Sequence, residues 1–281
     1  ILSTQFVDRF AAFSRAFAKL LRDETDGPHF LTPVNEISFF SWAGGEVGYF
    51  NPCEHGRGFE LKQQLVRAAI AGIEAVWDVL PHARIVHTDP MINVVPASEQ
   101  PEDVERAQAE QNASFDGWNM IAGKICPELG GDMKYLDIIG INYYVHNQWL
   151  YPGGHGTMIA PSHPRYVPVR ELLARLHERF GRPILIAETG IEDGARPAWL
   201  RYMATEVRAA IRNGVPVEGL CLYPIVNHPG WDDDRHCHNA LWDYADKKGH
   251  RAPYQPLVEE LQCQQQLLRD LRAGRDVADD L

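Results

Sequence analysis

The stretch Pro183-Ile184-Leu185-Ile186-Ala187-Glu188-Thr189-Gly190 begins with five apolar residues and ends with a glutamate, a threonine and a glycine. A continuous apolar run of this length predicts a strand buried on both faces, as in a parallel sheet. The stretch Thr32-Pro33-Val34-Asn35-Glu36 has a similar pattern, because a glutamate again follows an apolar run. The carboxyl ends of parallel strands are where β/α enzymes place their chemistry. We therefore expect Glu36 and Glu188 to form one catalytic pair.

Strand-like segments alternate with amphipathic helices along the whole chain, which predicts an α/β fold with helices on both faces of a parallel sheet. The expected fold class is a TIM-type (β/α)8 barrel that is incomplete, with about five βα units forming a single domain over residues 1–281. The expected strands cover residues 30–34, 84–89, 136–144, 183–187 and 217–226, and the expected helices cover residues 6–20, 60–80, 103–122, 169–180, 199–211 and 257–271. Long loops are expected at residues 43–58 and 146–168.

Composition narrows the class of protein. Apolar residues make up 45% of the 281-residue chain and charged residues 23%, which is ordinary for a globular protein. The net charge of −11 argues against a nucleic-acid partner. No apolar run reaches the roughly 18 residues that a membrane span needs. The five cysteines are scattered and form no Cys-x-x-Cys pair, so we expect reduced thiols in a cytoplasmic protein.

A pair of carboxyl groups suits the retaining hydrolysis of a glycosidic bond, which needs them about 5–5.5 Å apart. One carboxylate attacks the sugar, and the other donates a proton to the leaving oxygen. Asn35 offers an amide beside Glu36, and His87 and Asp89 end a strand, so all three are candidate substrate-binding residues. Trp231 lies in a loop that follows a strand and could stack on a sugar face. The expected partner is a carbohydrate or glycoside, and this chemistry needs no metal or organic cofactor.

The acidic and histidine residues between positions 232 and 238 could also indicate a metal site. Asp232, Asp233, Asp234, His236 and His238 have residue types that bind metals. A His-x-His spacing alone is weak support for a metal site, and a solvated charged loop is the preferred interpretation.

The order of the motifs resembles the family 1 β-glucosidases and their relatives among the retaining (β/α)8 glycosidases. TPVNE matches the family's acid/base segment at its fourth strand, GINYY (140–144) its sixth strand, and IAETG its seventh. The resemblance implies that Glu36 is the acid/base and Glu188 the nucleophile. It also implies that Tyr144 contacts the nucleophile and that Asn142, in the same segment, contacts the substrate.

The chain also departs from the family pattern. Ile37 follows Glu36 where the family has proline, and Gly230 takes the place of a glutamate that grips sugar hydroxyls, although Trp231 keeps the aromatic platform. Only about 30 residues precede the first motif, so the resemblance implies that the first three βα units are absent. A fragment and a natural short form are both compatible with this.

An incomplete barrel has two unpaired edge strands, and we expect a homo-oligomer to cover them. The alternative function is that of a catalytically impaired relative that binds carbohydrate or has a structural role.

Overall fold

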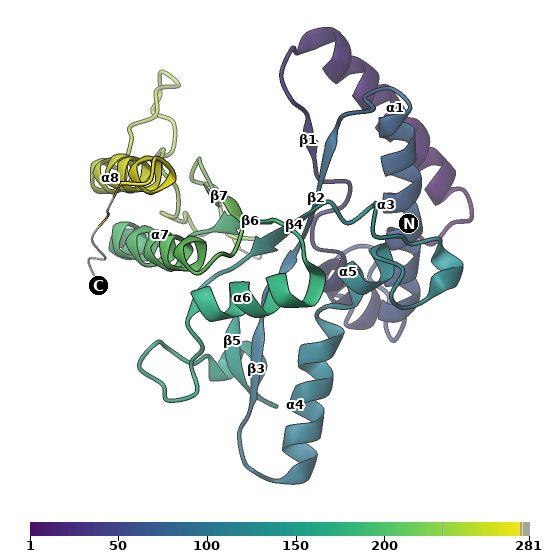
Figure 1. The fold of residues 1–281 in the computed structure, drawn as a ribbon, viewed down its shortest axis with the longest axis horizontal. Coiled ribbons are helices and arrows are strands. Elements are labelled where there is room, and N and C mark those ends of the chain that lie inside the picture. The colour runs from purple at the N-terminus through teal and green to yellow at the C-terminus, as the bar shows by residue number, and fades with distance from the viewer. Residues whose placement is uncertain (232, 276, 278–281) are drawn as a thin grey trace. The chain divides into compact units, whose positions relative to one another are not determined.

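The computed structural model describes residues 1–231, 233–275 and 277. Its main sheet has five strands in the order β1-β2-β4-β6-β7, and helices separate the strands along the chain (Figure 1). These strands are β1 Phe30–Leu31, β2 Arg84–Pro90, β4 Ile138–Asn142, β6 Ile184–Thr189 and β7 Val217–Leu222. The helices are α1 Phe6–Glu24, α2 Ile37–Ser41, α3 Gly58–Trp77, α4 Pro101–Ala113, α5 Asp116–Ile121, α6 Val169–Phe180, α7 Arg196–Arg212 and α8 Gln255–Arg272. The α/β class and the strand order are those expected of an incomplete TIM-type barrel.

The chain divides into two compact units. The first comprises residues 1–141 and 149–157, and the second comprises residues 142–148 and the described part of 158–281. This division concerns packing and does not test whether the chain is one domain, so the single domain over residues 1–281 stays a prediction.

The first unit contains strands β1, β2 and β4 of the main sheet. β1 pairs in parallel with β2, with Phe30 beside Arg84. All of β4 is buried, and Ile139 and Ile141 have no exposed surface, as the apolar run predicts. Helices α1 and α3 lie side by side in this unit (Figure 1). They pack closely because Gly72 has no side chain, since a Cβ there would lie 2.8 Å from the Phe10 ring.

The second unit is built around β6 and β7, which pair in parallel with Ile184 opposite Val217. Helices α7 and α8 lie side by side in this unit (Figure 1). Met203 and Val207 on α7 are buried, as is Leu257 on α8. This packing follows from the amphipathic spacing of the two helices, whose apolar stripes face a core.

Several expected elements differ in the structure. The first strand has only two residues rather than five, and Phe30 is 56% exposed because β1 is an end strand of the sheet. The helix expected over residues 103–122 is broken between α4 and α5. The phenylalanines of α1 do not share one environment, because Phe13 is 66% exposed while Phe10 faces α3.

The two expected loops contain secondary structure. Helix α2 is followed by a π-helix, Trp42–Glu46, in the first of them. The second contains β5 (Gln148–Tyr151), which pairs with β3 (Asn93–Pro96) in a separate two-stranded sheet. Short 3-10 helices lie at Pro127–Leu129, Gly154–Thr157 and Asp193–Ala195.

The described part of the chain also bears on membrane insertion and metal binding. Among these residues, no helix combines the length and the apolar character needed to cross a bilayer. Nor do the described histidines, cysteines and acidic residues form a group of three that could hold a metal ion.

Candidate active site

Glu188 lies at the carboxyl end of β6, where backbone hydrogen bonds hold it on both sides. The Tyr143 N–H donates to the Glu188 carbonyl over 2.9 Å, and the Tyr223 N–H donates to the Thr189 carbonyl over 2.9 Å. Thr189 is fully buried, whereas the Glu188 side chain is only half-buried. The strand therefore places a carboxyl group at a partly open position on a fixed backbone.

The Glu188 carboxyl group has a direct side-chain partner. The Tyr144 hydroxyl donates to Glu188 Oε2 over 2.8 Å, which is the contact that the family resemblance implies. The Tyr144 ring is itself held, because it stacks on His146 with ring centroids 5.7 Å apart, and its N–H donates to Asn147. Glu188 is thus an oriented carboxylate.

The neighbouring Tyr143 has a structural role. It is 1% exposed, stacks on Trp199 at 6.2 Å, and shares hydrogen bonds with Tyr166 (3.2 Å) and Gln148 (2.9 Å). Burial raises the pKa of the Tyr143 phenol well above its usual value, so this ring stays neutral. The structure thus separates the two tyrosines of the motif, one into the core and one beside Glu188.

Asn142, a predicted substrate-binding residue, is fully buried. Its carbonyl accepts a hydrogen bond from the Asn147 side chain over 3.2 Å, which anchors the loop that carries Tyr144. A residue without exposed surface meets a substrate only if its surroundings move. We therefore assign Asn142 to the support of Tyr144 rather than to the binding surface.

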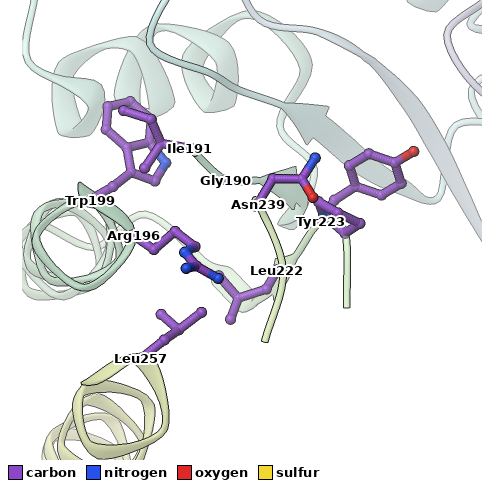
Figure 2. A pocket seen from close by; sticks show the side chains of 9 residues that line it. Gly190, Ile191, Arg196, Trp199, Leu222, Tyr223, Asn239 and Leu257 are labelled. Carbon is purple, nitrogen blue, oxygen red and sulfur yellow. The ribbon is translucent and has the colours of Figure 1, made fainter. Parts of the chain in front are cut away.

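A small pocket lies beside the segment Gly190–Ile191, which follows Glu188 and Thr189 in the chain (Figure 2). It is lined by Gly190, Ile191, Arg196, Trp199, Leu222, Tyr223, Pro224, Asn239 and Leu257. The Arg196 guanidinium in its wall donates to the carbonyls of Asp193 (2.7 Å) and Ala240 (2.5 Å). Trp199 donates to Thr189 Oγ1 over 2.8 Å. Arg196 and Trp199 are thus used within the fold, and they support the backbone after Glu188.

Glu36 lies between β1 and α2, in the first unit. Its backbone is left-handed, with φ 52° and ψ 57°, which a glutamate adopts only where its surroundings impose it. Two bonds fix this turn, since the Glu36 N–H donates to the Thr88 carbonyl over 2.9 Å and the Phe40 N–H donates to the Glu36 carbonyl. The Glu36 side chain is half-buried.

Asn35 is exposed, and its side-chain oxygen accepts a hydrogen bond from the Thr88 hydroxyl over 2.7 Å. Next to Thr88, Asp89 is buried and accepts hydrogen bonds from Ser38. Ser38 was not predicted from the sequence, where its one distinguishing feature is its position two residues after Glu36. The end of β2 therefore holds the segment that carries Glu36.

His87 does not lie at a binding surface. Its side chain is 2% exposed, and Nε2 lies 3.0 Å from the Tyr135 carbonyl. Since a carbonyl only accepts, His87 Nε2 carries the proton. Burial lowers the pKa of His87 to about 4, so the ring is neutral near pH 7. We leave His87 out of the candidate site because its ring is buried and is held by the Tyr135 carbonyl.

Trp231 is 70% exposed, as a stacking platform requires. Of the nearby acidic and histidine residues considered as a metal site, Asp232 lies outside the described residues. Further along the chain, Arg235 forms an ion pair with Glu192 at 2.6 Å. The ring of His236 stacks on Tyr244 at 4.6 Å. These contacts favour the interpretation as a surface loop.

The comparisons with known proteins give the fold. No family model and no curated protein sequence matches the chain. Among solved structures, a β-glucosidase from Thermotoga maritima in complex with glucoimidazole matches with a TM-score of 0.73 and 17% identity, over 93% of this chain and 69% of its own. A hyperthermophilic β-glucosidase mutant that forms a dodecamer in the crystal matches with a TM-score of 0.72 and 18% identity, over 92% and 61%.

A family 1 β-glucosidase from Thermotoga maritima matches with a TM-score of 0.71 and 17% identity, over 92% of this chain and 68% of its own. The chain therefore spans about two thirds of the length of these three structures. At this identity the likeness establishes an incomplete β/α-barrel fold, and function must be argued from the side chains.

Proposed function

We propose that the chain is a glycoside hydrolase that cleaves β-glycosidic bonds with retention of configuration. The observation that carries the proposal is the Glu188 carboxyl group at the end of β6, bound by the Tyr144 hydroxyl at 2.8 Å. The half-buried Glu36, at the start of α2, supplies the second carboxyl group. The glycosidase-type fold of the chain supports this pairing.

The proposed reaction has two displacements. In the first, a Glu188 carboxylate oxygen attacks the anomeric carbon while Glu36 gives its proton to the glycosidic oxygen, and the alcohol leaves. In the second, Glu36 takes a proton from water, the water oxygen bonds to the anomeric carbon, and the bond to Glu188 breaks. Tyr144 holds the attacking carboxylate throughout. Every group needed for this sequence is an amino-acid side chain.

Two exposed side chains are proposed to bind the substrate. Asn35 presents its amide beside Glu36 and Trp231 presents an indole ring. Amides bind sugar hydroxyls, and aromatic faces pack on the apolar faces of sugars.

The proposal is tested with aryl β-glycosides on wild-type protein and the Glu188→Gln variant. We expect the variant to lose at least about 10³-fold in kcat, since a nucleophile is removed. Glu178→Gln, an exposed residue on α6, is the matched control and should keep the wild-type rate. Tyr144→Phe should lose less, about 10-fold, because it removes one hydrogen bond to the carboxylate. Equal rates for wild type and Glu188→Gln would refute the mechanism.

A second candidate is a carbohydrate-binding protein without turnover, and the 70% exposed Trp231 favours it. In that case wild type and Glu188→Gln both show no turnover, yet both bind oligosaccharides in titration calorimetry. Trp231→Ala should then abolish binding.

We also propose that the chain assembles into a homo-oligomer that covers the two end strands, β1 and β7. Phe30 on β1 is 56% exposed, and Ile225, just after β7, is 51% exposed. Unpaired strand edges with apolar side chains favour association.

A cytoplasmic location remains part of the proposal, on the basis of the cysteines. All five, at positions 53, 126, 221, 237 and 263, are free thiols, which suits a reducing compartment. Fractionation of the source cells followed by detection with an antibody would test it.

A further inference from the structure

Trp199, on α7, connects two segments of the chain that meet at Glu188. Its indole N–H donates to Thr189 Oγ1 over 2.8 Å, and its ring stacks on Tyr143, with the ring planes 4° apart and the centroids 6.2 Å apart. Thr189 has no exposed surface, and Tyr143 is 1% exposed. An indole nitrogen only donates, so the hydrogen bond with Thr189 has one possible direction. One side chain therefore holds a residue of β6 and the residue that follows β4.

Both partners of Trp199 bind or adjoin Glu188. The Tyr143 N–H donates to the Glu188 carbonyl over 2.9 Å, and Thr189 is the next residue along β6. The residue after Tyr143 is Tyr144, whose hydroxyl donates to Glu188 Oε2 over 2.8 Å. The position of the carboxyl group relative to the Tyr144 hydroxyl thus depends on two segments that Trp199 joins.

Helix α7 is itself fixed at the end that carries Trp199. The Arg196 guanidinium, one turn earlier, donates to the Ala240 carbonyl and lies over the Tyr254 ring, 3.7 Å from its centroid. The Trp199 ring also packs on the Tyr202 ring, with centroids 5.6 Å apart. Trp199 and Arg196 line the same pocket beside β6 (Figure 2). A side chain on a fixed helix holds its partners more precisely than one on a loop.

A second tryptophan has the same two kinds of contact in the first unit. Trp77, at the end of α3, stacks on Tyr135 with centroids 5.9 Å and ring planes 11° apart, and it donates to the Ala83 carbonyl over 2.9 Å. Glu188 and the partners of Trp199 belong to the second unit. Trp77 therefore provides a control for the loss of an indole hydrogen bond that has only a structural role.

We infer that Trp199 is a positioning residue for Glu188. It holds Thr189 and Tyr143 in one arrangement, and this keeps the carboxylate aligned with the Tyr144 hydroxyl. The inference rests on the proposed role of Glu188 as the nucleophile. A nucleophile must meet the anomeric carbon at a defined distance and angle, and a displacement of about 1 Å can lower the rate about 10²-fold. Trp199 acts on this geometry through its two partners and not by contact with the substrate.

The test is amide hydrogen exchange, measured by NMR on the full chain without substrate. Trp199→Phe keeps a ring beside Tyr143 but removes the N–H that binds Thr189. We expect the two backbone N–H groups that donate to the carbonyls of Glu188 and Thr189 to exchange at least about 10-fold faster, relative to the amide of Val207 on α7. A mere loss of stability would instead speed the exchange of all three amides alike.

Thr189→Val removes the acceptor instead of the donor, and it serves if Trp199→Phe does not fold. It should speed the exchange of the same two amides relative to Val207. Thr189→Ser keeps a hydroxyl group and should retain the wild-type ratio. Trp77→Phe, which loses the matching hydrogen bond in the first unit, should also retain it.

Kinetics with aryl β-glycosides give a second measurement in an active protein. Trp199→Phe should lower kcat about 10-fold and leave KM within about 2-fold of wild type, because the substrate still binds while the nucleophile is displaced. Trp77→Phe should keep both constants at their wild-type values.

Unchanged exchange ratios in whichever of Trp199→Phe and Thr189→Val folds would overturn the inference, whether or not the protein is active. An active protein in which Trp199→Phe keeps the wild-type kcat would overturn it as well. Equal rates for wild type and Glu188→Gln would instead overturn the proposed function. Because the exchange measurement needs no turnover, the two failures are separable.

Discussion

At the scale of single residues, β2 carries two buried titratable groups with opposite behaviour. Burial raises the pKa of Asp89 to about 7 and lowers the pKa of His87 to about 4, because in each case it disfavours the charged form. The carboxyl group faces Ser38 and the segment of Glu36, while the imidazole faces the Tyr135 carbonyl. His87 and Asp89 are thus only two positions apart on β2, yet Asp89 lies near the segment of Glu36 and His87 belongs to the core.

The pKa of His87 predicts how stability depends on pH. Because its folded pKa is lowered from 6.5 to about 4, its contribution is fully present above pH 6.5 and is lost as pH falls toward 4. Between pH 7.5 and pH 4.5, wild-type protein should lose about 2 to 3 kcal/mol of unfolding free energy to His87 alone. In His87→Gln, whose amide can still donate to the Tyr135 carbonyl, this loss should be absent.

Urea unfolding at the two pH values measures the difference between wild type and variant. Asp89 adds the opposite trend, since its raised pKa gives stability that is lost as pH rises from 3.8 to about 7. That trend is present in both proteins and cancels in the difference. His82→Gln, at an exposed position, should follow wild type. If His87→Gln had the wild-type pH dependence, the imidazole would have to be charged in the folded state.

The sequence alone could predict part of this site. Glu188 at a strand end followed from the apolar run, and its contact with Tyr144 followed from the family resemblance. The Ser38–Asp89 bond joins residues 51 positions apart, and no local pattern reports it. The left-handed turn at Glu36 could not be predicted from the sequence either, because a glutamate does not favour that conformation.

At the scale of elements, prediction succeeded where the apolar period was clear and local. Helix α6 has the expected bounds, because Leu172, Leu173 and Leu176 form one buried stripe. The pairing of β3 with β5 could not be predicted, since it joins segments far apart in the chain. The break between α4 and α5 was missed because helical periodicity continues across it in the sequence.

The contact between β2 and β4 predicts the effect of a glycine substitution. A Cβ at Gly140, on β4, would lie 2.6 Å from the Thr88 methyl group and 2.9 Å from Val86 Cγ1. Gly140→Ala should therefore lower the free energy of unfolding by about 1–3 kcal/mol, the usual cost of overpacking. Chemical denaturation measures this loss.

The matched control is Gly219→Ala on β7, where the nearest atom is the flexible Leu185 Cδ1 at 3.3 Å. Its stability should stay within about 0.5 kcal/mol of wild type, as for substitutions that meet no rigid neighbour. Similar losses in both variants would mean that the cost comes from the strand glycine itself and not from the contact with β2.

At the scale of the whole molecule, the end strands β1 and β7 predict the state of assembly. If association covers them, light scattering after size-exclusion chromatography should give a wild-type mass that is a multiple of 31.7 kDa. Phe30→Glu and Ile225→Glu each place a charge at an end of the sheet, which weakens edge pairing, so both should shift the mass toward that of the monomer. Phe13→Glu places the same charge on the exposed face of α1 and should leave the mass unchanged. A wild-type protein that stays monomeric and soluble at all concentrations would contradict the proposed oligomer, and a Phe13→Glu monomer would move the interface from the sheet edges to α1.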